Sequence, residues 1–199
     1  KNPLAHERTL FILSAFYLMY LRISELVSNT RWEPQMGHFY QDENKFWWFM
    51  TVGKGNKERH IPVSNDMLTA LKRYRKSRDL MPDLPAPAET TPLLHKLKGK
   101  GPMTSDRPIR ALVQQCFDEA VLLLKKQNKQ EDAISLEQAT VHWLRHTGIS
   151  DDINKRQRPV AHVRDDAGHS SSATTDRYNN IEREERHQSA KNKTIKNNS

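Results

Sequence analysis

The sequence predicts a mostly helical α+β domain with one small antiparallel β-sheet or hairpin. Segments with apolar residues at helical spacing dominate the chain, while one short aromatic stretch is followed by a glycine-containing turn and a second β-rich segment. The length of 199 residues suits one domain with a hydrophobic core. Hydrophobic residues make up 36% of the chain and charged residues 28%, which fits a globular protein.

The first predicted element is a buried helix over residues 6–20, which carries apolar side chains around most of its circumference and contains no Gly or Pro. Its apolar run, residues 10–21, is interrupted by Ser14 and is too short to cross a bilayer, so we expect no membrane partner. A second short helix is predicted over residues 24–27, with Ser24 as its N-cap.

A β-hairpin is predicted next. Residues 46–52 read Phe-Trp-Trp-Phe-Met-Thr-Val, a composition typical of a buried strand. Residues 53–57 form a turn with two glycines and an Asn, and residues 59–63 supply the return strand. The tip of this hairpin is strongly basic.

The remainder of the chain is predicted to be mainly helical. Periodicity and capping residues indicate helices over residues 64–78 and 107–126, from Thr140 onward, and, more weakly, over 160–166. The segments between them are a proline-rich connector (82–92), a polar loop (128–133) and a polar stretch (151–158). A loop over 168–172 then leads to a short helix that carries Tyr178, with Thr174 or Thr175 as its cap.

Charge and cysteine content point to a partner and a setting. The net charge of +8 suggests a polyanion, most commonly nucleic acid. Cys116 is the single cysteine, so no disulfide can form within the chain, and a reducing, cytoplasmic setting fits best.

Five short segments stand out for their chemistry. They are Leu-Arg-Ile-Ser-Glu-Leu around Arg22, Gly-Lys-Gly-Asn-Lys-Glu-Arg around Lys54, His-Trp-Leu-Arg-His-Thr from His142, Gly-His-Ser around His169, and Tyr178 nine residues later. Each alone is a weak signal, because a helical Arg is usually a solvated charge and a late Tyr usually packs in a core.

In this order the segments resemble the catalytic domain of the tyrosine recombinases, the phage-integrase family, from about residue 10 to about residue 181. The resemblance implies a catalytic domain over residues 1–182 and a charged, partly disordered tail over 183–199. It also implies that an N-terminal core-binding domain is absent from this chain. The implied activity is site-specific cleavage and rejoining of DNA through a covalent 3′-phosphotyrosyl intermediate, which needs no metal ion or cofactor.

The resemblance assigns roles to six catalytic residues. Two arginines clamp the phosphate, a role that suits the planar, permanently charged guanidinium group. Two histidines hydrogen-bond the same phosphate, and the phenol of a tyrosine is the nucleophile. A lysine at the hairpin tip protonates the departing 5′ oxygen. The two arginines are Arg22 and Arg145, and the two histidines are His142 and His169. The nucleophilic tyrosine is Tyr178, and the lysine at the hairpin tip is Lys54.

Neighbouring residues take supporting roles in this comparison. Lys57 is a rival to Lys54 within the same turn, and Glu25 resembles an acidic residue that orients an active-site Arg or His. Basic residues expected to bind double-stranded DNA are Lys57, Arg59, Arg107 and Arg110, with Lys96, Lys98 and Lys100 as further candidates. The resemblance also implies a tetramer assembled on two DNA sites.

The sequence departs from the family pattern in three places. Met19 and Tyr20 stand where the family usually has Thr-Gly, before the Arg22 segment. The stretch 149–167 carries several charged residues where relatives usually show an apolar helix pair, which puts the local packing in doubt. The stretch between Arg31 and Phe46 is also longer than expected, which suggests an extended loop.

Three other functions fit parts of the same pattern. A type IB topoisomerase shares the Arg, Lys, His and Tyr chemistry but relaxes supercoils without exchanging strands. A DNA-binding module that no longer cuts is a second alternative, because of the altered stretch 149–167. A metallohydrolase using His142 and His146 is a third, although no third ligand or Glu base stands at the required spacing.

Overall fold

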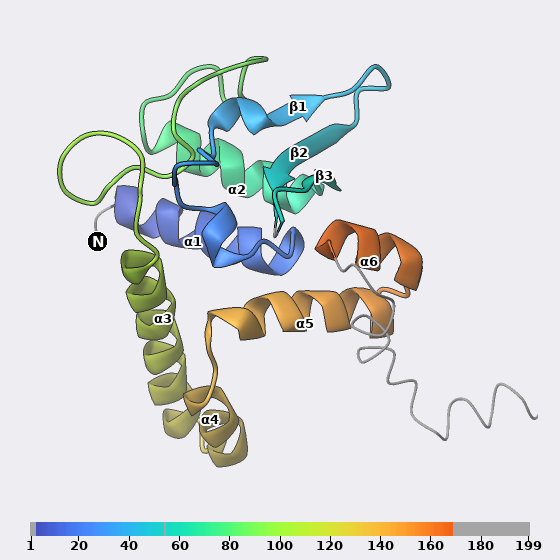
Figure 1. Cartoon of the computed structure of the whole chain (residues 1–199). Helices are drawn as coiled ribbons and strands as arrows, with labels where there is room; N and C mark the ends of the chain where they lie inside the picture. The colour runs from blue at the N-terminus through green and yellow to red at the C-terminus, as the bar shows by residue number, and fades with distance from the viewer. Residues whose placement is uncertain (1–2, 54, 169–199) are drawn as a thin grey trace, which may run out of the picture.

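The computed structural model describes residues 3–53 and 55–168 of the chain (Figure 1). Within these residues the helices are α1 (Pro3–Leu18), α2 (Asn65–Lys76), α3 (Arg107–Lys126), α4 (Gln130–Glu137), α5 (Val141–Asn154) and α6 (Val160–Ala167), with two short 3₁₀ helices, η1 (Ile23–Glu25) and η2 (Met36–His38). The strands β1 (Phe39–Gln41), β2 (Trp47–Val52) and β3 (Glu58–Pro62) form one antiparallel sheet in the order β1-β2-β3. The predicted α+β class is confirmed.

Helix α1 lies at the centre of the molecule. It packs against α2, α5 and α3, and Figure 1 shows α5 running below it while α2 and the sheet lie above. Phe11, Ile12, Ala15 and Phe16 are each at most 1% exposed. A helix that is apolar on most of its circumference can be stable only when it is covered on several sides, and this explains its central place.

The predicted hairpin is confirmed as β2 and β3. Phe49 pairs with Ile61 in the antiparallel register, and both side chains are buried. The two-residue alternation of a strand puts Glu58 and His60 on the exposed face and Arg59 on the same face as Ile61. The basic residues of the hairpin therefore do not form one exposed surface: Lys57 is exposed, whereas Arg59 is directed toward the protein interior.

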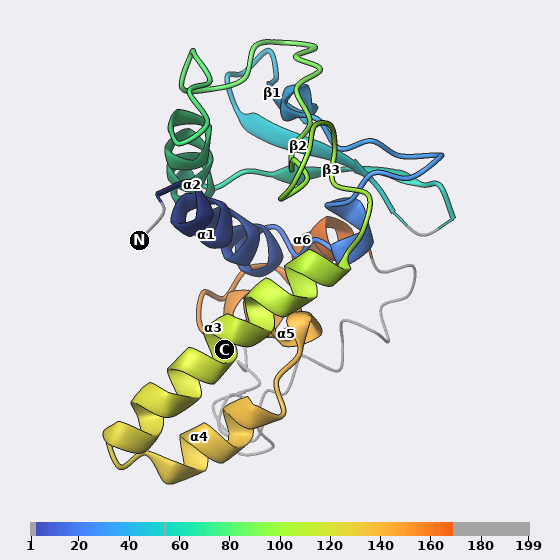
Figure 2. The same cartoon turned by 90° about the vertical axis from the view of Figure 1, so that its left-hand side faces the viewer.

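Three predictions of local structure were wrong or incomplete. The short strand β1 lies within the stretch expected to be a loop, where Phe39 pairs with Phe49. Helix α4 occupies most of the predicted polar loop, because packing of Ala133 beside α3 outweighs the polar composition (Figure 2). Residue Arg22, and not Ser24, is the N-cap of the short helix η1.

A second, smaller apolar cluster joins α5, α6 and the end of α1. It consists of Tyr20, Ile149, Ile153, Val163 and Ala167. The charged stretch 149–167 thus does form a helix pair, although its apolar core is small. The contacts of the remaining charged side chains in this stretch affect the geometry of the site.

Helices α1 and α5 cross at Gly148. A Cβ atom added at Gly148 would lie 2.0 Å from the carbonyl oxygen of Tyr17, a distance that no side chain can occupy without moving the backbone. Close contact between the two helices therefore requires glycine at this position. None of the helices in residues 3–53 and 55–168 has the length and apolar character needed to span a membrane.

We predict that Gly148→Ala lowers the free energy of unfolding by roughly 1–3 kcal/mol, because the added methyl group forces α5 away from α1. Urea denaturation followed by circular dichroism measures this change. Thr147→Ala, at an exposed neighbouring position of the same helix, is the control and is expected to change it by less than about 0.5 kcal/mol. Equal stabilities of the two variants would contradict the close helix crossing.

Candidate functional site

Arg22 lies where the chain leaves α1 and enters η1. Its backbone N–H donates to Oε2 of Glu25 at 2.6 Å, and this bond closes the short 3₁₀ turn. Its guanidinium group donates to the carbonyl oxygens of Gly168 at 3.2 Å and Ala167 at 3.5 Å. These two bonds hold Arg22 against the end of α6. Its side chain is 27% exposed, so part of it still faces solvent.

Among the residues described, Glu25 is the only acidic side chain that forms an ion pair with Arg22 or Arg59, and it is 1% exposed. Arg59 approaches it with both Nη atoms, at 2.9 Å from Oε1 and 3.0 Å from Oε2. Nη1 of Arg22 lies 3.5 Å from Oε1. A carboxylate this deeply buried needs such partners, and the two-pronged contact with Arg59 joins η1 to strand β3.

Arg145 comes from the middle of α5 and is 5% exposed. It donates to the carbonyl oxygen of Tyr20 and, at 2.6 Å, to that of Ala167. Burial, together with the nearby charges of Arg22 and Arg59, lowers the pKa of Arg145 to about 9. With that pKa the guanidinium group remains charged at neutral pH.

The last turn of α6 is the point at which the three arginines meet. The carbonyl oxygen of Ala167 accepts hydrogen bonds from Arg145 at 2.6 Å and from Arg22 and Arg59 at 3.5 Å. The C-terminal end of a helix carries partial negative charge, which favours cations there. Gly168 ends the helix with φ +62°, and a Cβ atom on it would lie 2.7 Å from Nη1 of Arg59.

These contacts bring together charged side chains from three separate segments of the chain, around a backbone carbonyl group from a fourth. Three guanidinium groups and one carboxylate leave a local net charge of about +2. Such a concentration of arginine is suited to binding an anion, and the planar guanidinium group matches the non-bridging oxygens of a phosphate.

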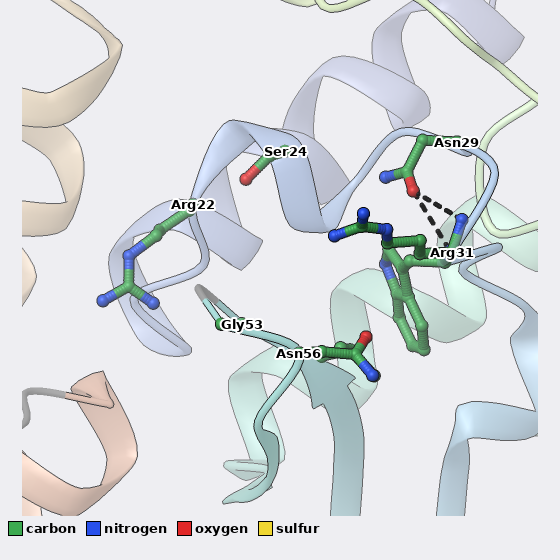
Figure 3. Close-up of a pocket in the computed structure, with 9 residues that line it drawn as sticks. Arg22, Ser24, Asn29, Arg31, Gly53 and Asn56 are labelled. Atoms are coloured by element: carbon green, nitrogen blue, oxygen red, sulfur yellow. Dashed lines mark hydrogen bonds between the residues drawn. The ribbon is translucent and has the colours of Figure 1, made fainter.

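A pocket of about 440 Å³ lies beside Arg22. Figure 3 shows Arg22 on one side of it, Arg31 on the other, and Asn56 of the hairpin turn below. Asn29 fixes this wall, because its side-chain oxygen accepts from the backbone N–H groups of Arg31 at 2.9 Å and Trp32 at 3.1 Å. The guanidinium group of Arg31 is exposed and has no hydrogen-bond partner among the residues that the structure describes.

The hairpin turn also lies against the arginine cluster. A Cβ atom on Gly53 would be 3.4 Å from Oε1 of Glu25 and 3.5 Å from Nη1 of Arg22. Gly53 therefore lies at the edge of the arginine cluster.

His142 occupies the first turn of α5, three residues before Arg145, and its side chain is exposed. Its ring centroid lies 6.1 Å from that of His146. Within residues 3–53 and 55–168 no three His, Cys, Asp or Glu side chains are grouped so that they could hold a metal ion.

The chain is similar to a known protein family. A model of the phage integrase family matches residues 2–185. The chain belongs to the phage integrase family. No curated protein sequence matches it.

Several solved structures share the fold of this integrase-family domain. The XerH site-specific recombinase bound to palindromic difH substrate, in a post-cleavage complex, superposes with a TM-score of 0.59 at 20% identity, over 94% of this chain and 46% of the XerH chain. The XerA recombinase gives a TM-score of 0.55 at 16% identity, over 97% and 63%. The integrase of transposon Tn1549, in complex with transposon right end DNA, gives 0.55 at 18%, over 94% and 57%. The integrase-family domain thus spans 46–63% of the length of these proteins.

The structure brings together several of the residues predicted from the sequence. Arg22, Glu25 and Arg145 lie in one cluster, and His142 lies one helical turn from Arg145. Lys54, His169 and Tyr178 lie outside the residues described, as does the tail over 183–199. The roles of all these residues in this integrase-family domain remain predictions.

The predicted DNA-binding residues divide into two groups. Lys57, Arg107 and Arg110 are exposed, as are Lys96, Lys98 and Lys100. Arg59 instead has a side chain only 10% exposed and is bound to Glu25. Burial lowers its pKa, and the charge of Glu25 opposes this effect. Any contact of Arg59 with DNA would therefore occur inside the arginine cluster.

Sequence reasoning missed three features of the site. The inward direction of Arg59 was detectable, because the alternation of β3 places it on the same face as the apolar Ile61. The Ala167 carbonyl gave no signal, since any residue supplies the same backbone group. The pocket near Arg31 depends on how η1 approaches the hairpin, and this is a property of the tertiary structure.

We predict that Glu25→Gln destabilises the domain by about 3 kcal/mol, because the substitution leaves buried guanidinium groups without their counter-charge. Chemical denaturation measures the change. Glu58→Gln is the matched control: Glu58 is 60% exposed and, among the described residues, pairs only with His60, so its loss is expected to cost less than about 0.5 kcal/mol. A Glu25→Gln variant as stable as the control would show that the arginine cluster does not depend on this carboxylate.

Proposed function

We propose that this domain is the catalytic part of a site-specific recombinase or integrase that cleaves and rejoins DNA through a covalent phosphotyrosyl intermediate. The observation that carries the proposal is the convergence of Arg22, Arg145 and Arg59 around the buried Glu25 and the Ala167 carbonyl. Membership of the phage integrase family supports it. So does the shared fold with XerH, whose structures include pre-cleavage and post-cleavage complexes with difH.

The charge of the cluster suits this reaction. A phosphodiester carries one negative charge, and attack by a phenolate adds a second in the transition state. A site with a net charge of about +2 therefore stabilises the transition state more than the ground state. Because the guanidinium groups are already oriented by Glu25 and Ala167, little reorganisation is needed when the charge develops.

In the proposed reaction the hydroxyl oxygen of Tyr178 attacks the phosphorus atom and the bond to the 5′ oxygen breaks. His169 or the phosphate itself accepts the phenol proton, and Lys54 gives a proton to the departing 5′ oxygen. His142 hydrogen-bonds the phosphate. The position of Gly53 against Arg22 and Glu25 supports a role for the residue that follows it. The phosphotyrosyl bond retains the energy of the broken linkage, so a 5′ hydroxyl can reverse the step without ATP.

The proposed partners are double-stranded DNA and further copies of the same protein, assembled as a tetramer on two DNA sites. The formal net charge of +8 favours binding to DNA, and a cytoplasmic, DNA-associated location is consistent with this partner. Contacts with phosphates along the duplex are assigned to Lys57, Arg107 and Arg110. The segment that precedes α3 adjoins the segment that contains Arg31, because the backbone N–H of Ser28 donates to the carbonyl oxygen of Met103 at 2.7 Å.

The test of the proposal is formation of a covalent adduct. A DNA duplex nicked near the cleavage site is incubated with the protein in the absence of metal and ATP, and a protein–DNA adduct is sought on a denaturing gel. We predict an adduct with the wild-type protein and none with Tyr178→Phe, because the substitution removes the attacking oxygen.

Tyr40→Phe is the matched control, since Tyr40 lies on β1 and its hydroxyl contacts only His60 among the described residues. It is expected to form the adduct at the wild-type rate. An adduct that persists in Tyr178→Phe would refute the assigned nucleophile. Failure of the full-length protein to form any adduct on its own site would favour a DNA-binding module that does not cut.

The pocket beside Arg22 generates a separate prediction. Arg31 faces Arg22 across this pocket, and we assign to it the phosphate next to the one that is cleaved. Arg31→Ala is expected to weaken DNA binding at all sequences and to reduce the slope of log K against log salt by about 1. Lys72→Ala, on an exposed position of α2 away from the pocket, is the control with the same change in charge. Equal salt slopes for the two variants would exclude this assignment.

A further inference from the structure

The charged residues of the stretch 149–167 form a connected network beside the arginine cluster. Asp152 lies on α5, Arg158 in the connection between α5 and α6, and Asp166 on α6. Nη1 of Arg158 donates to Oδ2 of Asp152 at 2.9 Å, and Nη2 donates to Oδ2 of Asp166 at 2.7 Å. Asp152 and Asp166 are only 7% and 8% exposed. One guanidinium group therefore joins two buried carboxylates from two helices.

Tyr20 connects this network to α1. Its hydroxyl donates to Oδ2 of Asp152 and accepts from Nη1 of Arg158 at 3.1 Å. The side chain is 1% exposed, and burial, with the neighbouring Asp152, raises the pKa of Tyr20, so the hydroxyl keeps its proton and remains a donor. Burial also raises the pKa of Asp166, although Arg158 opposes this effect.

The backbone of Tyr20 explains why this contact matters. Its φ is +51°, in the left-handed region that favours glycine, and a large side chain is strained there. The buried hydrogen bonds of the hydroxyl offset that strain. The carbonyl oxygen of the same residue accepts a hydrogen bond from Arg145. One residue thus contacts the network through its side chain and an arginine of the site through its backbone.

The other end of the network reaches the site in the same way. Asp166 directly precedes Ala167, whose carbonyl oxygen accepts from Arg145, Arg22 and Arg59. Helix α6 has only eight residues, and only Val163 and Ala167 of it are buried apolar residues. The ion pair between Arg158 and Asp166 adds a directional contact to this small apolar one and fixes the position of the helix end.

We propose that Tyr20, Asp152, Arg158 and Asp166 form a positioning network that holds the Tyr20 and Ala167 carbonyl oxygens in place and so orients Arg145 toward the DNA phosphate. The network thus adds a small set of directional bonds to the small apolar contact between α5 and α6. The expected effect of the network on DNA cleavage rests on the proposed function. Its expected effect on the orientation of Arg145 does not depend on that function.

Two variants test the network. Tyr20→Phe removes only the hydroxyl, and Arg158→Lys keeps the charge but cannot join both carboxylates with one planar group. Arg164→Lys is the matched control, because Arg164 lies on α6 and pairs only with its neighbour Asp165 among the described residues. Circular dichroism establishes which proteins are folded at the assay temperature, and if Arg158→Lys is unfolded, Tyr20→Phe carries the test.

Three quantities are measured for each folded protein: the affinity for DNA, the single-turnover rate of adduct formation, and the NMR signals of the Arg145 side chain in protein with ¹⁵N-labelled arginine. We expect DNA affinity within about 2-fold of the wild type, an adduct rate lower by at least about 10-fold, and shifted Arg145 signals, since small displacements of catalytic groups slow reactions strongly. Arg164→Lys is expected to match the wild type in all three.

Folded variants with wild-type adduct rates and unchanged Arg145 signals would overturn the inference, since the network would then only stabilise α6. A loss of DNA affinity at an unchanged adduct rate would also overturn it. If the full-length wild-type protein forms no adduct on its own site, the proposed function fails, and the Arg145 signals still decide whether the network orients this arginine.

Discussion

The site depends on bringing three guanidinium groups close together in a largely buried place. Like charges repel more strongly where water is excluded, so such a cluster is stable only if negative groups are placed within it. The carboxylate of Glu25 and the carbonyl oxygen of Ala167 supply them. Arg145 shows the residual cost, because burial and the other two arginines lower its pKa to about 9. The same residual positive charge makes the cluster suited to an anion such as a phosphate.

The rest of the fold can be understood as support for this cluster. The central helix α1 ends at Leu18, and the left-handed Tyr20 that follows turns the chain into η1, where Arg22 and Glu25 lie. Strand β3 supplies Arg59, and α5, which packs tightly on α1 at Gly148, supplies Arg145. Helix α6 then brings its C-terminal carbonyl group to all three arginines. Because each arginine comes from a different element, their alignment requires all of these packing contacts.

Regular elements with a strong apolar pattern were predictable from the sequence. The helix over residues 107–126 and the hairpin formed by β2 and β3 were found because spacing and turn residues are local signals. Helix α4 and strand β1 were missed for the opposite reason. The first is mostly polar and the second has three residues, so packing against α3 and β2 decides their structure. Pairing of Asp152 and Asp166 with Arg158 likewise requires the folded α5–α6 unit.

The sequence by itself determined the family, the order of the motifs and the candidates Arg22, Glu25 and Arg145, because these depend on residue identity and spacing along the chain. Only the tertiary structure decided that Arg59 turns inward to Glu25, that the Ala167 carbonyl joins three arginines, and that Tyr20 links a strained turn to the network around Asp152. These facts concern distances between residues up to 145 positions apart and backbone groups that every residue possesses. No local pattern encodes such contacts, since they arise only when α1, α5 and α6 are packed together.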